Sequence, residues 1–263
     1  TGVSGFVGTG VPIDPKATAP SGASTTAIGI DSIFGSDDRI QISPATSYPA
    51  RAVVQITRNG AAHCTGWLYG PDVVATAGHC VHSGGGDGDW YTGLAVWPGR
   101  NGSFAPYGSC AARQLYSVTG WTVNGNEAYD YGAIKLNCSI GNTVGWFGYW
   151  WQSASLTGAR ILINGYPGDK PFGTQWRGDR VARAVAVSRT NQIFYRNDTT
   201  GGMSGSPIYQ IRPAGSPFCT GYCAMGIHAY GFPHGDYPHD TYNHGTRITE
   251  ARFNNLIAWR DAP

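Results

Sequence analysis

The stretch from Thr199 to Pro207, which reads TTGGMSGSP, holds the residues best suited to covalent chemistry. Ser204 lies between Gly202 and Gly205, and glycines leave room for an acyl group to approach the hydroxyl of a serine nucleophile. The same turn could aim the backbone N–H groups of Gly202 and Ser204 at one point, as an oxyanion hole requires. Because glycine and serine are common in loops, the stretch taken alone is also typical of a plain turn.

A histidine and an aspartate earlier in the chain have the surroundings that a general base and its partner need. His79 directly precedes Cys80 at the end of an apolar run, so a disulfide at Cys80 would hold the imidazole in place. Asp130 begins another apolar run, and a carboxylate that enters a core needs a partner such as an imidazole N–H. Each residue alone could be a packed histidine or a turn aspartate. The order His79, Asp130, Ser204 predicts a catalytic triad in the order found in chymotrypsin-like proteases.

The composition limits the fold and the partners. The chain has 263 residues, with 39 glycines and 13% charged residues, which suits short strands joined by many turns in one all-β domain. The net charge of +2 and the scattered arginines argue against a nucleic-acid partner, and no apolar run is long enough to span a membrane. Six cysteines fit three disulfides. With no signal peptide at its start, we expect a processed chain that is secreted and extracellular.

Apolar and β-branched runs between turn signals predict strands along most of the chain. The predicted strands cover residues 52–56, 64–69, 72–77, 94–97, 114–118, 132–136, 160–164, 181–187, 206–211 and 224–229. Aromatic residues cluster at 141–157, which we interpret as packing between two β halves rather than as a ligand platform. A helix is predicted at 250–260 after Thr249, a residue suited to N-capping. Residues 1–31 are rich in Gly, Ser, Thr, Ala and Pro, which predicts an extended arm that packs on the rest of the chain.

Several motifs, in this order, resemble those of the secreted bacterial glutamyl endopeptidases, which are chymotrypsin-like serine proteases. The motifs are GSDDR at 35–39, CTGW at 64–67, VATAGHC at 74–80, YDYGAI at 129–134, GNTVG at 141–145, GYPGDK at 165–170, GTQW at 173–176, the serine turn, and GTRIT at 245–249. The resemblance covers about residues 32–259. It implies an all-β fold of two antiparallel six-stranded β-barrels of the chymotrypsin type with a C-terminal α-helix.

The resemblance also implies how the parts are arranged. His79 and Asp130 come from the first barrel and Ser204 from the second, with the active site between them. The implied protease domain spans 32–263, with an N-terminal barrel at about 48–140, a bridge at 141–157, a C-terminal barrel at about 158–248 and the helix at about 250–260. The family pattern pairs Cys64 with Cys80 and Cys219 with Cys223, which leaves Cys110 with Cys138 as the third disulfide.

The residues before the nucleophile point to two different substrate preferences. Asp198 at the base of a pocket would attract Arg or Lys, as in trypsin-like enzymes. The Thr199 hydroxyl and the His228 ring would instead donate hydrogen bonds to a carboxylate. In the family that the chain resembles, the matching Thr and His bind the substrate glutamate, which favours cleavage after Glu and, less well, Asp. The chain has two glutamates, Glu127 and Glu250, which would limit self-digestion, although lysine is equally scarce.

The arm at 1–31 is open to two interpretations. Met203 stands where related proteases have an aspartate that pairs with a new amino terminus, so any such control must work differently here. Family members begin near the position of Ser32, and we expect the arm to be a propeptide remnant rather than a permanent extension. Asp31 would then be an acidic site at which the enzyme could cut its own chain.

Other signals are weaker. The histidines at 234, 239 and 244 invite a metal site, but their spacing and the surrounding Gly, Pro and Tyr favour a surface loop. The acidic, glycine-rich residues 84–89 lack a full calcium loop and favour a flexible turn. We therefore expect no metal and no cofactor, a monomer, and polypeptide substrates with acidic residues. The alternatives are a trypsin-like protease that uses Asp198 to cut after Arg or Lys, and a secreted, non-catalytic β binding module, for instance one that binds carbohydrate.

Overall fold

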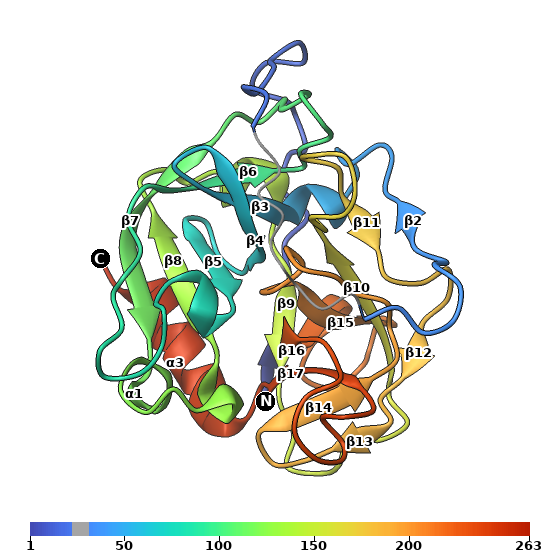
Figure 1. Ribbon diagram of the computed structural model, residues 1–263. Coiled ribbons are helices and arrows are strands. Elements are labelled where there is room, and N and C mark those ends of the chain that lie inside the picture. The colour runs from blue at the N-terminus through green and yellow to red at the C-terminus, as the bar shows by residue number, and fades with distance from the viewer. Residues whose placement is uncertain (23–31) are drawn as a thin grey trace.

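A computed structural model describes residues 1–22 and 32–263 (Figure 1). The first half of the chain forms a closed six-stranded barrel with the strand order β3-β4-β5-β8-β7-β6. Its strands are β3 (Val53–Arg58), β4 (Ala61–Leu68), β5 (Val73–Thr76), β6 (Leu94–Pro98), β7 (Cys110–Ser117) and β8 (Gly132–Leu136). The predicted six-stranded N-terminal barrel is therefore confirmed.

The strands β3, β5 and β8 are rich in apolar residues because both of their faces are buried. Alternate residues point to opposite sides of a strand. In β3, Val54 and Ile56 belong to the core inside the barrel, whereas Val53 belongs to a second core that the two halves share. In β4, Leu68 and Trp67 divide in the same way. The shared core fixes the barrel against the second half.

The second half is one eleven-stranded sheet, which is larger than the expected six-stranded barrel. Its main path runs β13 (Val187–Ser188), β14 (Gln192–Tyr195), β17 (Asn243–Arg247), β16 (Gly221–Tyr230), β15 (Pro207–Arg212), β10 (Arg160–Gly165), β11 (Trp176–Arg177) and β2 (Ile40–Gln41). Off this path, β12 (Arg183–Ala184) pairs with β10, and β9 (Gly148–Trp150) pairs with β16 and β1 (Gly2–Val3). Short strands from the arm and the bridge thus enlarge the sheet.

Two details of the second half differ from the prediction. The single strand expected at 181–187 is wrong: β12 pairs with β10 and β13 pairs with β14, so the chain changes partners between them. The strands β14 and β17 were not predicted, because their polar and aromatic residues do not alternate in a recognisable pattern.

The helices are short except for the last. They are α1 (Thr119–Thr122), α2 (Gly141–Val144) and α3 (Glu250–Asp261), with 3-10 turns η1 (Ala50–Ala52), η2 (Gly78–Cys80) and η3 (Glu127–Tyr129). The predicted N-cap of α3 is confirmed, because the Thr249 hydroxyl accepts the N–H of Arg252 at 3.5 Å. Figure 1 shows α3 (red) behind the first barrel, where Phe253 and Leu256 join the shared core.

The bridge and the arm pack as expected where the structure describes them. Phe147 and Tyr149 contact the Trp67 ring from the opposite half, which confirms aromatic packing between the halves. Phe6 of the arm packs on Trp146 with ring centroids 4.5 Å apart. Asp31 lies outside the described residues.

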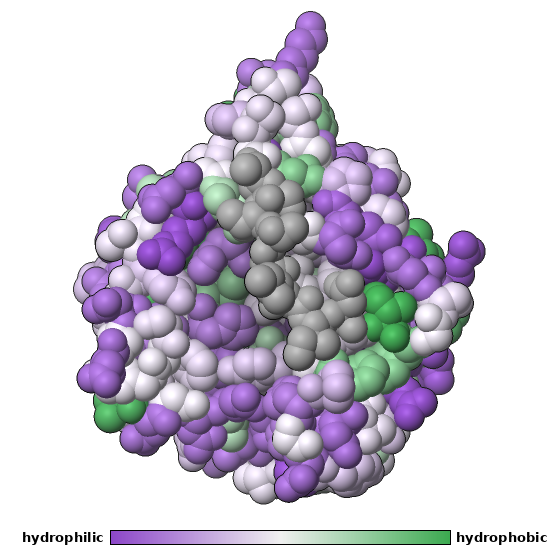
Figure 2. All heavy atoms as spheres, in the orientation of Figure 1, coloured by the Kyte–Doolittle hydropathy of each residue, from purple (hydrophilic) through white to green (hydrophobic). Residues whose placement is uncertain are grey.

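The structure contains all three expected disulfides, Cys64–Cys80, Cys110–Cys138 and Cys219–Cys223. The face of the molecule in Figure 2 is mainly hydrophilic, with a few small apolar patches. Among the described residues, no helix combines the length and apolar character needed to cross a membrane.

Candidate active site

A cavity of about 370 Å³ lies where the two halves meet. Residues from both halves line it: His79, Glu127, Thr199, Thr200, Gly201, Ser204, His228, Ala229, Tyr230, Gly231 and His234. Four of the residues predicted from the sequence, His79, Ser204, Thr199 and His228, therefore share one cavity, and Asp130 lies directly behind His79.

His79 and Asp130 form a tight, two-point contact. The His79 Nδ1 lies 2.6 Å from one carboxylate oxygen of Asp130, and the His79 backbone N–H donates to the other at 2.8 Å. Asp130 is completely buried, whereas 27% of the His79 side chain is exposed to the cavity. Burial opposes a charge on His79, but the negative charge and hydrogen bond of Asp130 outweigh it, so the His79 pKa is raised above 6.5. The arrangement fixes the ring with Nε2 available for a proton.

Ser204 lies in the same cavity but is turned toward another partner. Its Oγ donates to the carbonyl oxygen of Ala229 at 3.4 Å, and within the described chain no hydrogen bond joins it to His79. A serine hydroxyl can change rotamer readily, and catalytic hydrogen bonds in ligand-free sites are often incomplete.

The turn around Ser204 requires its glycines. Gly202 has φ of +94° and Gly205 has φ of +88°, and a side chain at either position would approach backbone oxygens to 2.6 Å or less. The turn is held from the first barrel, where the N–H of Thr65 donates to the Ser204 carbonyl at 2.9 Å and its hydroxyl donates to the Gly202 carbonyl at 2.8 Å. Thr65 lies within the CTGW motif at 64–67, but its contact with the serine turn is long-range and could not be predicted from the sequence.

The two N–H groups predicted for the oxyanion hole are available. Within residues 1–22 and 32–263, neither Gly202 nor Ser204 donates its backbone N–H to a protein acceptor. Their neighbours do: Met203 donates to Thr200, and Gly205 donates to His228. The turn therefore leaves unpaired the two donors that an oxyanion would need.

A tyrosine and an asparagine orient the polar groups of the pocket wall. The Tyr195 hydroxyl lies 2.7 Å from Nδ1 of His228, so Nε2 is the ring nitrogen left for a ligand. The Asn243 amide donates to the Thr199 hydroxyl oxygen at 2.9 Å, which leaves the Thr199 hydroxyl proton free to donate. Neither Tyr195 nor Asn243 was predicted, because they lie on the two strands that the sequence pattern did not reveal.

Burial keeps His228 neutral. The residue is 3% exposed, and burial, together with His244 and His79, lowers its pKa to about 3. Burial raises the pKa of Tyr195 well above its usual value, so the phenol keeps its proton. Thr199 and His228 thus present neutral hydrogen-bond donors to the cavity rather than a fixed charge.

Asp198 does not serve this pocket. The described residues that line the cavity do not include it, and its side chain is completely buried. One of its carboxylate oxygens accepts the N–H of Phe34 at 2.8 Å, and Phe34 does not line the cavity either.

The expected surface loop around the three histidines is wrong in part. His244 lies on β17 and is completely buried, because its ring stacks between Phe194 and Tyr230. Glu127 approaches both His234 (3.3 Å) and His244 (3.8 Å), so these three residues could hold a metal ion. A second group with this capacity is Asp38, Asp179 and Asp198.

Comparisons with known proteins place this geometry in a family. The trypsin family model matches residues 39–257. A glutamyl endopeptidase of Bacillus licheniformis is 42% identical over 258 residues, which cover 98% of this chain and 78% of that protein. A Bacillus subtilis protein named extracellular metalloprotease is 43% identical over 87% of this chain and 69% of its own length.

A solved structure of a Glu endopeptidase in complex with MPD superposes with a TM-score of 0.70 at 29% identity, and covers 88% of this chain and 100% of that chain. The match over most of the chain, together with the close relative in Bacillus licheniformis, shows that the chain belongs to the trypsin family of serine proteases, in the group of the glutamyl endopeptidases.

Proposed function

We propose that this protein is an endopeptidase that hydrolyses peptide bonds on the carboxyl side of Glu and, less well, of Asp. The observation that carries the proposal is the pocket wall beside Ser204, where Thr199 and His228 offer neutral donors while Asp198 faces away. A substrate carboxylate can accept hydrogen bonds from the Thr199 hydroxyl and from Nε2–H of His228. At this wall the positive side chain of Arg or Lys would meet hydrogen-bond donors rather than acceptors. Glu127, the carboxylate among the described lining residues, pairs with His234.

In the proposed reaction, Ser204 first turns from the Ala229 carbonyl toward His79. Its Oγ bonds to the scissile carbonyl carbon while Nε2 of His79 takes the hydroxyl proton. The carbonyl oxygen becomes an oxyanion and accepts the N–H groups of Gly202 and Ser204. The C–N bond then breaks, and His79 passes its proton to the leaving amine, which gives an acyl-enzyme. A water molecule, activated by His79, releases the acid and restores Ser204.

The buried Asp130 carboxylate supports this cycle in two ways. It fixes the proton of His79 on Nδ1, so that Nε2 faces the serine, and its negative charge stabilises the imidazolium that forms in each half of the reaction. All these groups come from one chain, so we expect a monomer to be active. The three disulfides suit a secreted, extracellular enzyme.

Two diphenyl phosphonates that differ in one side chain test the proposal. The phosphonate with a glutamate side chain should label one serine per chain, Ser204, as its Oγ–P bond forms and phenoxide leaves. The phosphonate with an arginine side chain should react far more slowly. Faster labelling by the arginine compound would refute the substrate preference, and labelling of neither would refute the nucleophile.

We also propose that residues 1–31 are separable from a protease domain of residues 32–263. Ser32 pairs with Thr199 through two backbone hydrogen bonds, so the start of that domain is anchored at the pocket wall. Intact-mass measurement of the active enzyme tests this, because a fully active species that still begins at Thr1 would contradict removal of the arm.

A further inference from the structure

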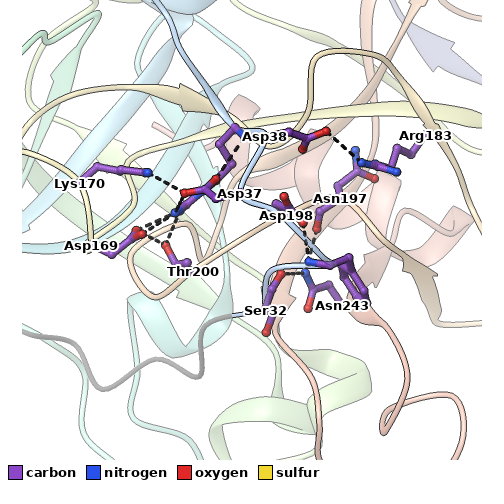
Figure 3. Close-up of polar contacts among 12 residues, drawn as sticks. Ser32, Asp37, Asp38, Asp169, Lys170, Arg183, Asn197, Asp198, Thr200 and Asn243 are labelled. Atoms are coloured by element: carbon purple, nitrogen blue, oxygen red, sulfur yellow. Dashed lines mark hydrogen bonds and ion pairs between the residues drawn. The ribbon is translucent and has the colours of Figure 1, made fainter.

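Three aspartates from distant parts of the sequence meet behind the pocket wall. Asp38 lies just before β2, Asp179 follows β11, and Asp198 directly precedes Thr199. Asp179 and Asp198 are buried, at 1% and 0% exposure, and the Asp38 side chain is 38% exposed. Figure 3 shows Asp38 and Asp198 in one group of polar residues, with Arg183 beside Asp38.

Each of these aspartates has one oxygen in use and one without a partner. Asp198 accepts the Phe34 N–H, Asp179 pairs with Nε of Arg183, and Asp38 lies 3.3 Å from Nη2 of Arg183. Oδ1 of Asp38, Oδ2 of Asp179 and Oδ2 of Asp198 are buried and have no hydrogen-bond donor in the described part of the chain. Unpaired buried carboxylate oxygens are costly, so three in one place need an explanation.

The charges in this group do not balance. Three carboxylates face one guanidinium, that of Arg183. Arg39 and Lys170 do not supply a second cation, because they are already paired elsewhere (Figure 3). Arg39 pairs with Asp37 and Asp169, and Lys170 pairs with Asp37. Buried carboxylates are costly unless they are paired, so this group has room for a second cation.

The donor set favours calcium. Each aspartate offers a ligand oxygen, and these atoms all lie within 4.8 Å of one another, close enough to share one ion. Calcium takes six to eight oxygen ligands, including several carboxylates and amide carbonyls. Magnesium usually keeps several waters and is bound through one or two carboxylates, so three aspartates fit calcium better.

We propose that Asp38, Asp179 and Asp198 bind one calcium ion, which ties three chain segments together behind the substrate pocket. The Asn197 side chain, completely buried with neither amide atom hydrogen-bonded in the described chain, is the candidate for a fourth protein ligand. Because Asp198 leads directly into Thr199, the ion would stiffen the wall that presents the Thr199 hydroxyl.

Calcium binding to a catalytically inactive full-length chain tests the proposal independently of the substrate preference. The Ser204→Ala variant avoids self-digestion, and the chain is stripped with EGTA and then desalted. Titration calorimetry should give one Ca²⁺ per chain with half-saturation below about 1 mM, as in extracellular calcium modules. Thermal unfolding should shift upward by several degrees in 10 mM Ca²⁺ and much less in 10 mM Mg²⁺.

Matched variants identify the site. Asp179→Asn, made in the same inactive chain, should lose the calcium response while keeping the shape of the side chain. The control changes Asp87 and Asp89 to Asn in the glycine-rich turn, which should leave the response intact. If Asp179→Asn does not fold, Asp38→Asn, at a partly exposed position, should lose the response instead.

Two kinds of result would overturn the calcium proposal. No calcium response in the parent would overturn the proposal and mean that the carboxyl groups share protons. An undiminished response in Asp179→Asn or Asp38→Asn, or a response lost in the Asp87/Asp89 control alone, would also overturn it by placing the ion elsewhere.

Discussion

Removal of the Thr199 hydroxyl should selectively impair hydrolysis after Glu. Thr199→Val keeps the shape of the side chain but deletes the donor aimed at the substrate carboxylate. A hydrogen bond to a charged group contributes about 1.5–3 kcal/mol. Since about 1.4 kcal/mol corresponds to a factor of ten, kcat/KM for a Glu substrate should fall roughly 10- to 150-fold.

The structure indicates that this variant should fold. Thr199 accepts one hydrogen bond from the Asn243 amide, and that amide also donates to the carbonyl oxygens of Ser32 (3.0 Å) and Asn197 (2.8 Å). Asn243 therefore keeps two acceptors when the hydroxyl is removed, and the loss of activity reports on the pocket.

The assay compares two peptide substrates that differ only in Glu or Gln before the scissile bond. Gln has nearly the same shape as Glu but no charge, so its hydrolysis by Thr199→Val should fall much less. Thr199→Ser, which retains a hydroxyl, should recover most of the activity toward Glu. An equal loss for both substrates, or no loss for either, would refute the assignment of Thr199 as a carboxylate donor.

Three further predictions concern the His228 ring, the His79 ring and one disulfide of the first barrel. Tyr195→Phe removes the hydroxyl that contacts Nδ1 of His228. A lost hydrogen bond of about 1.4 kcal/mol should lower kcat/KM for Glu substrates roughly tenfold. Activity unchanged from the parent would contradict this role of Tyr195. The His79 pKa is raised above 6.5, and the protonated ring cannot accept the serine proton. The value of kcat/KM should therefore rise with pH through a midpoint above 6.5. A pH–rate profile with the uncharged Gln substrate measures this midpoint. Replacement of Cys110 and Cys138 by Ala removes a disulfide that joins residues 28 positions apart. The free energy of unfolding should fall by about 3–4 kcal/mol and the unfolding temperature by roughly 10 °C. Calorimetry that shows no decrease would mean that this disulfide does not restrain the unfolded chain.

The sequence was most informative where chemistry requires particular residues at particular places. The turn around Ser204 needs glycine at both 202 and 205, and the positive φ values there show why. The apolar runs before His79 and after Asp130 correctly predicted strands of the first barrel, since strands buried on both faces read as continuous apolar segments.

The sequence was least informative where long-range pairing decides the structure. Asp198 and Thr199 are adjacent, yet one faces the Phe34 N–H and the other faces the cavity, and no local pattern distinguishes them. His244 was assigned to a loop because its neighbours are polar and rich in turn residues, but pairing of β17 with β14 and β16 buries it. Propensity alone does not reveal such strands, because their neighbours in the sheet stabilise them.

The most direct test of the central claim is digestion of a denatured protein of known sequence, with every cleavage site identified by mass spectrometry. Cuts after Glu, with fewer after Asp, are the result that the pocket of Thr199 and His228 predicts. Cuts after Arg and Lys would contradict the account, because they would require Asp198 to face the substrate.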